Sequence, residues 1–343
     1  MCKRILATQT NTEGGVPFYK IRTIGGTPDA YISKELFDDY KTKYNYPHKG
    51  EVMITCAGTV GKCVIYDGKD AYYQDSNIVW IDNPSQYIGN GFLYHLLANV
   101  DWRKLNSTTI IRIYNDDLRN LKLSYPQIEE QKKISRLLSL LDDRISTQNK
   151  IIEDLKKLKS AISKKLLDND RWTTYKIQDI AKIGRGRVIS SVEIERQKHP
   201  LYPVYSSQTS NDGIMGYLDD YMFDGEYITW TTDGANAGTV FYRKGKFNCT
   251  NICGTLKIQP KYDCYFVSLV LQQATQKYVS FNLANPKLMN NIMASIKIKM
   301  PDIEMQKQLS KIFQTLDSCL LVHQRTCDMY SREKQYLLCQ MFI

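Results

Sequence analysis

The sequence has no apolar run that approaches the roughly 20 residues of a membrane-spanning helix. The basic residues Lys3 and Arg4 are not followed by an apolar segment, which excludes a secretory signal peptide. The nine cysteines include no Cys-x-x-Cys pair, and no histidine or second pair accompanies Cys249 and Cys253 at the spacing of a zinc site. We therefore expect a cytoplasmic protein with reduced thiols and no bound metal.

The motifs of the common enzyme classes are also missing. Residues 57–62, Ala-Gly-Thr-Val-Gly-Lys, place two residues between the glycines where a phosphate-binding loop needs four. Gly184–Ile189 lacks the third glycine of a dinucleotide-binding loop, and the Asn-Pro pairs at 83 and 285 do not continue into an adenine-methyltransferase motif. The four histidines form no His-Glu-x-x-His motif and no convincing triad. We therefore expect no catalytic residues and a binding function.

The charge of the chain indicates what it binds. Lysine and arginine total 46 against 36 aspartate and glutamate residues, which gives a net charge of +10. A basic field attracts polyanions, with nucleic acid first among them, although a basic protein without such a partner remains an alternative. The 24 tyrosines suit a contact surface, because tyrosine offers a rigid area with one polar end. A length of 343 residues suits two domains.

The chain contains an internal repeat with an offset of 175 residues. Pro126–Asp142 and Pro301–Asp317 are identical at eight of seventeen positions. Each segment opens with Pro-x-Ile-Glu-x-Gln-Lys, and a proline followed by a glutamate is typical of the first turn of a helix. Because self-similarity at a fixed period marks repeated structural units, we expect two equivalent halves.

Each repeat predicts a long helix, at 126–167 and at 301–343. The first helix has seam residues Ile134, Leu138, Leu141, Ile145, Gln148, Ile152, Leu155, Lys159, Ile162 and Leu166, and the second has Leu309, Phe313, Leu316, Leu320, His323, Cys327, Tyr330, Lys334, Leu337 and Met341. These steps of three and four residues form a heptad seam. Polar residues interrupt it at equivalent places, Gln148 with His323 and Lys159 with Lys334. We expect two helices of about 60 Å packed as a coiled coil, in preference to ordinary amphipathic core helices.

The segments before the helices, 1–125 and 168–300, predict two mostly-β domains. Both are rich in short β-branched and tyrosine runs separated by glycine. A short helix is expected in each, near Phe92–Asn99 and near Phe266–Thr275. The fold class is therefore α+β, a tandem pseudo-repeat of domain, long helix, domain and long helix.

The repeated helices and three further segments resemble the specificity (S) subunit of type I restriction–modification systems, the HsdS family. Those segments are Gln74–Ile81, Tyr202–Tyr217 and Thr229–Gly238. The resemblance covers essentially the whole chain. It implies two target-recognition domains held apart by antiparallel helices, and a non-catalytic subunit that reads a bipartite site in double-stranded DNA.

The same resemblance implies partners and their cofactors. Two methyltransferase (M) subunits would carry S-adenosylmethionine, and up to two restriction (R) subunits would carry ATP with Mg²⁺, while this chain would bind no cofactor. The holoenzyme would have adenine methyltransferase and type I endonuclease activity. The alternative is a nonspecific nucleic-acid-binding coiled-coil protein without a restriction role. A hidden enzyme would need an acidic or histidine-centred pocket formed only in the fold.

The two halves differ at their beginnings. The second half begins with Trp172–Ile180 before it reaches Gly184–Ile189, whereas Met1–Ile5 is equivalent only to that later stretch. We therefore expect an opening strand or turn to be missing from the first domain. A shortened reading frame, a shuffled gene and a naturally compact form all fit this difference.

Candidate DNA-binding residues are polar or basic residues in loops that differ between the halves, because two half-sites normally differ. Base edges are read mainly by polar side chains and arginine, while lysine and arginine contact phosphate. Readout candidates in the first domain are Lys20, Arg22, Thr23, Lys41, Lys43 and Tyr44, and in the second they are Ser206, Ser207, Gln208, Thr209, Asn211, Thr231, Thr232 and Asn236. Phosphate candidates are Lys62, Arg243, Lys244, Lys246 and Lys287. For each, a solvated loop position is the alternative.

Overall fold

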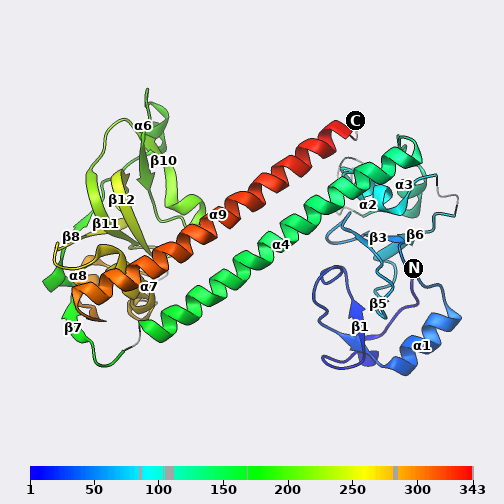
Figure 1. Ribbon diagram of the computed structural model, residues 1–343, viewed down its shortest axis with the longest axis horizontal. Coiled ribbons are helices and arrows are strands. Elements are labelled where there is room, and N and C mark those ends of the chain that lie inside the picture. Colours follow the sequence, from blue (N-terminus) through cyan, green and yellow to red (C-terminus); the bar gives the residue numbers. More distant parts are fainter. Residues whose placement is uncertain (85–86, 103, 105–111, 168, 281–284, 342–343) are drawn as a thin grey trace. The chain divides into compact units, whose positions relative to one another are not determined.

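The computed structural model describes residues 1–84, 87–102, 104, 112–167, 169–280 and 285–341. The chain forms two compact units: unit 1 is Met1–Lys150 with Gln324–Ile343, and unit 2 is Ile151–His323 (Figure 1). The two long helices are α4 (Ile128–Leu166) and α9 (Ile303–Met341). One part of each helix belongs to unit 1 and the other part belongs to unit 2. The prediction of two long helices in equivalent positions is confirmed.

A six-stranded mixed sheet forms the larger part of unit 2, in the order β10-β9-β12-β11-β13-β8. These strands are β8 (Ala181–Arg185), β9 (Tyr202–Tyr205), β10 (Ile214–Leu218), β11 (Phe223–Thr231), β12 (Val240–Cys249) and β13 (Cys253–Ile258). A separate antiparallel pair consists of β7 (Thr173–Lys176) and β14 (Lys297–Met300). The helices are α5 (Ile177–Ile180), α6 (Ser191–Glu195), α7 (Cys264–Ala274) and α8 (Asn290–Ser295), with the 3-10 helices η2 (Ser210–Gly213) and η3 (Thr275–Tyr278).

Unit 1 contains two three-stranded sheets, β2-β1-β5 and β4-β3-β6. Their strands are β1 (Val16–Tyr19), β2 (Tyr31–Ile32), β3 (Val52–Thr55), β4 (Cys63–Ile65), β5 (Tyr72–Tyr73) and β6 (Ile78–Ile81). Its helices are the 3-10 helix η1 (Ala7–Gln9) and the α-helices α1 (Lys34–Lys43), α2 (Asn90–Ala98) and α3 (Asn115–Arg119). The short helices expected near Phe92 and Phe266 are confirmed as α2 and α7.

The strand pairings of the two units correspond. In unit 1, β1 pairs antiparallel with β2 and parallel with β5; in unit 2, β9 pairs antiparallel with β10 and parallel with β12. Likewise β3 is flanked by antiparallel β4 and β6, as β11 is by β12 and β13. The α+β tandem repeat is therefore confirmed.

A buried glutamine joins each domain to its long helix. The side-chain oxygen of Gln131 accepts a hydrogen bond from the Gly89 backbone N–H at 2.8 Å, and its amide donates to the carbonyls of Tyr87 and Pro126. Gln306 repeats the arrangement: it accepts from Asp263 N–H at 3.0 Å and donates to the Pro301 carbonyl at 2.8 Å. Gly89 and Asp263 are the N-caps of α2 and α7. The glutamine of the repeated motif thus satisfies a backbone donor at the start of the domain's helix, where helical partners are missing.

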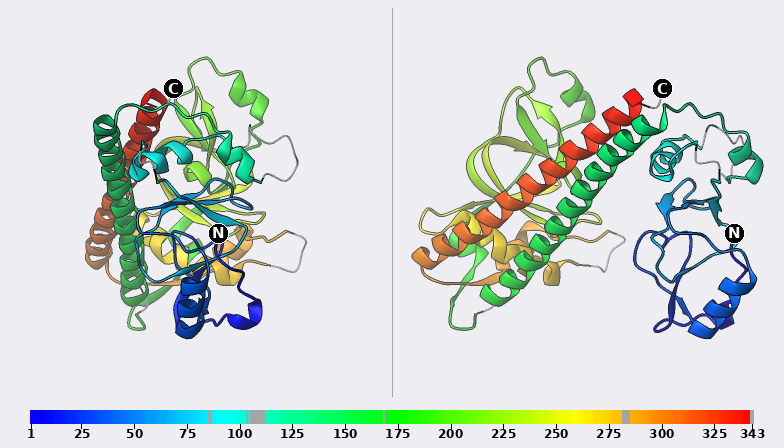
Figure 2. Two further views of the ribbon diagram at one scale, coloured as in Figure 1. Left: turned by 90° about the vertical axis from the view of Figure 1, so that its right-hand side faces the viewer. Right: turned by 45° about the vertical axis from the view of Figure 1, so that its right-hand side comes forward.

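The two long helices run antiparallel within each unit (Figures 1 and 2). In unit 1, Lys334 of α9 pairs with Asp142 of α4, and Cys327 contacts Asn149 further along both helices. In unit 2, Lys159 of α4 pairs with Asp317 of α9. The lysines that interrupt the predicted seam are therefore ion-paired with the aspartates that end the repeated motif. Because each repeat supplies one lysine and one aspartate, the two pairs are reciprocal.

The largest core lies in unit 2 and packs the sheet against the helices. Trp230, Phe266 and Phe313 come from β11, α7 and α9, and all three are fully buried in one cluster. The indole N–H of Trp230 donates to the Leu288 carbonyl at 2.9 Å, so its polar edge is satisfied. This cluster fixes the sheet of unit 2 to the first turns of α9.

The glutamine contact predicts a measurable loss of stability. Replacing Gln306→Leu leaves the Asp263 N–H without this partner in a buried setting, which we expect to lower the free energy of unfolding by about 1–3 kcal/mol. Gln314→Leu, at an exposed position of the same helix, should change it by less than about 0.5 kcal/mol. Urea denaturation followed by circular dichroism measures both. Equal stability of the two variants would contradict the anchoring role.

Candidate nucleic-acid interface

The loop at residues 206–213 carries most of the readout candidates of unit 2. A hydrogen bond between its first and last backbone groups closes it. Ser206 N–H donates to the Gly213 carbonyl at 2.8 Å. Asn211, Asp212 and Gly213 all have positive φ, at 49°, 53° and 80°. Inside the loop, the Gln208 amide donates to the Ile214 carbonyl, while Thr209 and Asn211 are exposed. The loop is therefore a shaped element in which Thr209 and Asn211 are exposed, and the Asn211 amide also donates to the Ile214 carbonyl at 3.4 Å.

The buried side chain of Arg243 binds this loop through Asp212. Its guanidinium donates to the Asp212 carboxylate at 2.6 Å and to the Asp212 carbonyl at 2.8 Å. The same group lies over the rings of Tyr205, at 3.6 Å, and Phe241, at 4.4 Å. Arg243 is only 4% exposed. This placement gives Arg243 a structural role instead of the phosphate contact expected from the sequence, because it cannot reach a phosphate without leaving these partners.

The turn between β11 and β12 lies beside the same loop. The Asn236 amide donates to the Ser207 carbonyl at 3.1 Å, which joins the two loops. Lys287 pairs with Asp233 of this turn at 3.5 Å. Of the other candidates here, Thr231 and Thr232 are buried, and Thr232 accepts from Arg185. The structure thus brings together the loop 206–213, Asn236 and Lys287, with Thr231 and Thr232 beneath them.

Lys244 and Lys246 lie elsewhere on β12. Lys244 is opposite Glu226 in the strand ladder and pairs with it at 3.2 Å. The Lys246 ammonium lies 4.4 Å from the centre of the Tyr221 ring and is exposed. Lys246 lies six positions along β12 from Val240, which is next to the turn, and this corresponds to about 20 Å. These two lysines therefore form a second basic position, away from the turn between β11 and β12, although Lys244 directly follows Arg243, which binds the loop 206–213.

In unit 1, one group of candidates lies around the loop after β1. Lys20 and Arg22 both pair with Asp29, at 3.1 and 3.3 Å, and the Lys20 hydrogen bond is the main reason that the pKa of Asp29 is lowered. The Lys62 ammonium donates to the Ile24 carbonyl at 2.5 Å, and Thr23 is buried. Lys62 and Thr23 therefore support the loop, whereas the Arg22 side chain is 88% exposed and could exchange its surface ion pair with Asp29 for a ligand.

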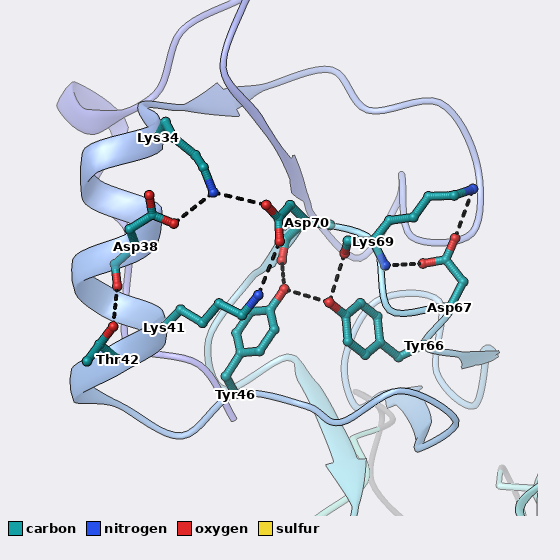
Figure 3. A network of polar contacts seen from close by, with 10 residues as sticks. Lys34, Asp38, Lys41, Thr42, Tyr46, Tyr66, Asp67, Lys69 and Asp70 are labelled. Atoms are coloured by element: carbon teal, nitrogen blue, oxygen red, sulfur yellow. Dashed lines mark hydrogen bonds and ion pairs between the residues drawn. The ribbon is translucent and has the colours of Figure 1, made fainter.

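The second group of unit 1 lies at the end of α1. Figure 3 shows Lys41 paired with Asp70, which also binds Lys34, at 3.1 and 3.0 Å. The Tyr46 hydroxyl donates to the Ala71 carbonyl. In the same view it contacts the Tyr66 hydroxyl. Lys43 pairs with Asp39, and the exposed Tyr44 lies under Lys3. Lys41 and Tyr44 line a surface groove of about 740 Å³.

One cluster around a histidine could in principle form a catalytic site that the sequence motifs do not show. His95 of α2 lies 3.4 Å from the Ser139 hydroxyl and 4.0 Å from the Asp142 carboxylate. Burial, with help from the nearby Lys334 charge, lowers the pKa of His95 to about 4. An imidazole this weakly basic is a poor proton acceptor at neutral pH, and its carboxylate lies beyond hydrogen-bond distance. The geometry favours a structural histidine. Among the described residues, no group of three or more His, Cys, Asp or Glu side chains could hold a metal ion.

The repeated architecture has a counterpart among known proteins. Residues 1–157 and 169–327 match the family model described as the type I restriction modification DNA specificity domain. The chain belongs to this family. The specificity-subunit resemblance is confirmed, and with it a role in DNA sequence recognition; the alternative of a nonspecific coiled-coil protein is not favoured.

Curated relatives of this specificity-domain chain carry the same designation. A putative type I specificity subunit of Mycoplasma pneumoniae is 34% identical over 238 residues, which cover 66% of this chain and 96% of the relative. A putative type I restriction enzyme specificity subunit of Haemophilus influenzae is 50% identical over 155 residues. That second match spans 45% of this chain and 40% of the relative's length.

Solved structures share the fold. The S subunit of a type I restriction–modification system from M. genitalium has a TM-score of 0.74 and 18% identity, and covers 100% of this chain and 92% of its own. A chain from a study of complex assembly and conformational transition in the type I system has a TM-score of 0.51 and 13% identity, covering 96% and 92%. In the described part of this specificity-domain chain, no helix is long and apolar enough to cross a lipid bilayer.

Several residues that matter here were missed at the sequence level. Asp212 and Asp29 were not expected to pair with the candidates Arg243 and Arg22. The stacking of Arg243 could have been predicted from the sequence. Residues two apart in a strand point to the same face, so Phe241 lies beside Arg243 and favours stacking of its guanidinium. The reciprocal ion pairs also had a signal, because Asp142 and Asp317 are identical positions of the repeat.

The position of Arg243 predicts that it orders the readout loop. Arg243→Met removes the hydrogen bonds to Asp212 and the stacked cation, which we expect to cost about 2–4 kcal/mol. Backbone amides of residues 206–213 should then exchange hydrogen about tenfold faster or more. Lys244→Met, the exposed neighbour, should change stability by less than about 0.5 kcal/mol. Unchanged exchange in the loop of the Arg243 variant would contradict this role.

Proposed function

We propose that the chain is the DNA-sequence-recognition subunit of a type I restriction–modification complex. Residues 1–125 and 168–300 would be its target-recognition domains, each reading one half of a bipartite double-stranded site. One observation carries the proposal: two domains of different sequence are attached to equivalent helices through the same buried-glutamine contact. A protein that binds nucleic acid nonspecifically has no need of two unlike domains on equivalent supports.

The candidate residues fall into two groups, those that could contact base edges and those that could contact phosphates. Thr209 and Asn211 are exposed on a shaped loop and suit base edges, whose donors and acceptors polar side chains can read. Arg22 of unit 1 suits either a base edge or a phosphate. Lys244 and Lys246 suit phosphates, because lysine contacts the backbone as a point charge and carries no fixed geometry. Of the remaining candidates, Thr23, Thr231, Thr232 and Arg243 are buried, whereas Lys41, Lys43 and Tyr44 are exposed at the end of α1.

The chain would act as a non-catalytic subunit of a holoenzyme in the cytoplasm. Two methyltransferase subunits would bring S-adenosylmethionine and adenine methylation, and up to two restriction subunits would bring ATP, Mg²⁺ and DNA cleavage. Family membership supports this arrangement. The contribution of this chain is to bind DNA at a defined sequence and to place the partner subunits there.

The long helices offer a pair of equivalent surfaces for the methyltransferase subunits. Leu137 of α4 and Ile312 of α9 occupy the same position of the repeat and are 42% and 45% exposed. Ile312 lines a surface groove of about 530 Å³ with Ile162 and Leu316, and the polar residues Gln308, Lys311 and Thr315 complete its lining. Exposed apolar patches of this kind mark protein interfaces. Two exposed apolar residues at equivalent positions suit two copies of one partner, so we assign the surfaces around Leu137 and Ile312 to the methyltransferase subunits.

Methylation mapping tests the recognition function. With the methyltransferase subunit of its own system, the full chain should direct adenine methylation to one bipartite motif, and without that subunit it should transfer no methyl group. Methyl transfer by the chain alone, or methylation without a motif, would refute the proposal.

A single loop variant tests which unit reads which half-site. Asn211→Gly removes the amide while glycine tolerates the positive φ of this position. We expect discrimination at one half-site to fall by about 1–3 kcal/mol, because a base-edge contact is lost. The other half-site is the internal control and should be unchanged. Equal loss at both half-sites would contradict separate readers.

Charged substitutions test the docking surfaces. Ile312→Asp and Leu137→Asp should each weaken binding of one methyltransferase copy by about tenfold or more, since an apolar contact is replaced by a charge that must be desolvated. Leu158→Asp is the control: Leu158 is 48% exposed on α4, and the equivalent position of α9 already carries Glu333. Sedimentation of the mixed subunits reports the stoichiometry. Full complexes with both test variants would refute the assignment.

A further inference from the structure

One position of the repeat carries a basic residue in both units. The offset of 175 residues relates Arg112 of unit 1 to Lys287 of unit 2. Lys287 is one of the phosphate candidates, and Arg112 is not among them. None of the residues 105–111 before Arg112 is identical to its counterpart at 280–286. The positive charge is therefore kept at this position although the sequence leading to it has changed completely.

The same backbone contact fixes this position in each unit. The residue after the cation is buried, and its backbone N–H donates to the first residue of a turn. Ile113 donates to the Cys56 carbonyl at 2.9 Å, and Leu288 donates to the Thr232 carbonyl at 2.9 Å. Two residues further along the chain, α3 and α8 begin. The two basic residues therefore leave the backbone at equivalent places.

The turn beside each cation adjoins a loop that carries readout candidates. In unit 1 the turn links β3 to β4, and the side chain of Ile21, in the loop after β1, lies beside Gly58. In unit 2 the turn links β11 to β12, and the Asn236 amide donates to the Ser207 carbonyl in the loop after β9. Gly58 and Gly234 of these turns both have positive φ, at 67° and 93°. Each unit thus places a cation next to the turn that supports its readout loop.

Both cations have surface contacts that a phosphate can replace. Lys287 pairs with Asp233 at 3.5 Å, and these side chains are 37% and 34% exposed. The Arg112 guanidinium donates to the carbonyl of the exposed Ser76 at 3.3 Å and lies 5.9 Å from the centre of the exposed Tyr114 ring. Contacts between exposed groups contribute little to stability, because water competes for them. Either side chain can therefore turn toward a phosphate at small cost.

The two half-sites of a bipartite target differ in their bases but share the same phosphate backbone. A basic residue that is kept at one position, beside loops that differ, therefore suits a phosphate and not a base edge. We propose that Arg112 is a phosphate-contacting residue of unit 1 and the counterpart of Lys287 in unit 2. Each domain would then be positioned on its half-site by a cation at the same place in the fold. This inference rests on the proposed DNA recognition and adds to it a residue that positions the first domain.

The salt dependence of DNA binding tests the role of Arg112. The protein is the full chain in complex with its methyltransferase subunits, and the probe is a duplex carrying the motif found by methylation mapping. Loss of one phosphate contact should reduce the slope of log binding constant against log salt concentration by about 0.9. We expect this reduction for Arg112→Gln, with binding about five- to tenfold weaker at about 0.1 M salt. Arg112→Lys keeps the charge and should restore both values.

Two further variants complete the comparison. Lys287→Gln should reduce the slope by the same amount as Arg112→Gln, and the double variant by about twice as much. Arg119→Gln is the matched control, because it removes the same charge from a side chain of unit 1 that is 76% exposed. Its slope should stay within about 0.2 of the original value. The methylated motif and the midpoint of urea denaturation should be unchanged in every variant, since a phosphate contact carries no sequence information and does not support the fold.

The outcomes separate this inference from the recognition function. An unchanged slope for Arg112→Gln overturns the inference, as does an equal effect of Arg119→Gln or a failure of Arg112→Lys to restore binding. A changed motif with an unchanged slope would make Arg112 a base reader and also overturns it. In all of these cases the unmodified complex still prefers its bipartite duplex, so the recognition function stands. If the unmodified complex shows no such preference, the recognition function fails and the inference fails with it.

Discussion

The buried glutamine at the base of each long helix is the contact on which the arrangement of each unit depends. A buried amide group is costly unless its donors and acceptor are satisfied. Gln131 and Gln306 meet this requirement with backbone groups at the N-terminus of a domain helix, which itself needs partners there. One side chain therefore satisfies two needs and fixes the direction in which the helix leaves the domain.

The ion pairs along the helices add specificity of pairing. A lysine within an apolar seam destabilises a coiled coil unless it finds a partner, but it restricts the alignments that the helices can adopt. Lys159 meets Asp317 and Lys334 meets Asp142, so a shift of one heptad would separate both pairs. Because the Asp317 carboxylate also accepts from Tyr265 of α7, the alignment of the helices is coupled to the domain of unit 2.

The sequence was sufficient for the repeat, the long helices and the mostly-β domains, because these follow from periodicity and local composition. It was insufficient for the site, since burial depends on contacts between distant segments. Arg243 and Lys62 have the residue types of phosphate contacts, yet both hold a backbone carbonyl inside the domain. Thr231 is the last residue of β11 and Thr232 follows it directly, and both are buried. The exposed residues of the loop 206–213 could be predicted, because three consecutive left-handed residues need the Asn-Asp-Gly sequence found there.

The chemistry of the glutamine contact also explains how one helix type can support two unlike domains. Each glutamine bonds only to backbone atoms, of Gly89, Tyr87 and Pro126 in one half and of Asp263 and Pro301 in the other. A contact to backbone places no demand on side chains, so the residues around it are free to differ. The contacts of Arg243 with the loop 206–213 are different, because they are made to side chains. They depend on the identity of Asp212, Tyr205 and Phe241. The glutamine contact can therefore be kept between unlike domains, whereas the side-chain contacts beside it, such as that of Tyr265 with Asp317, depend on the residues of the domain.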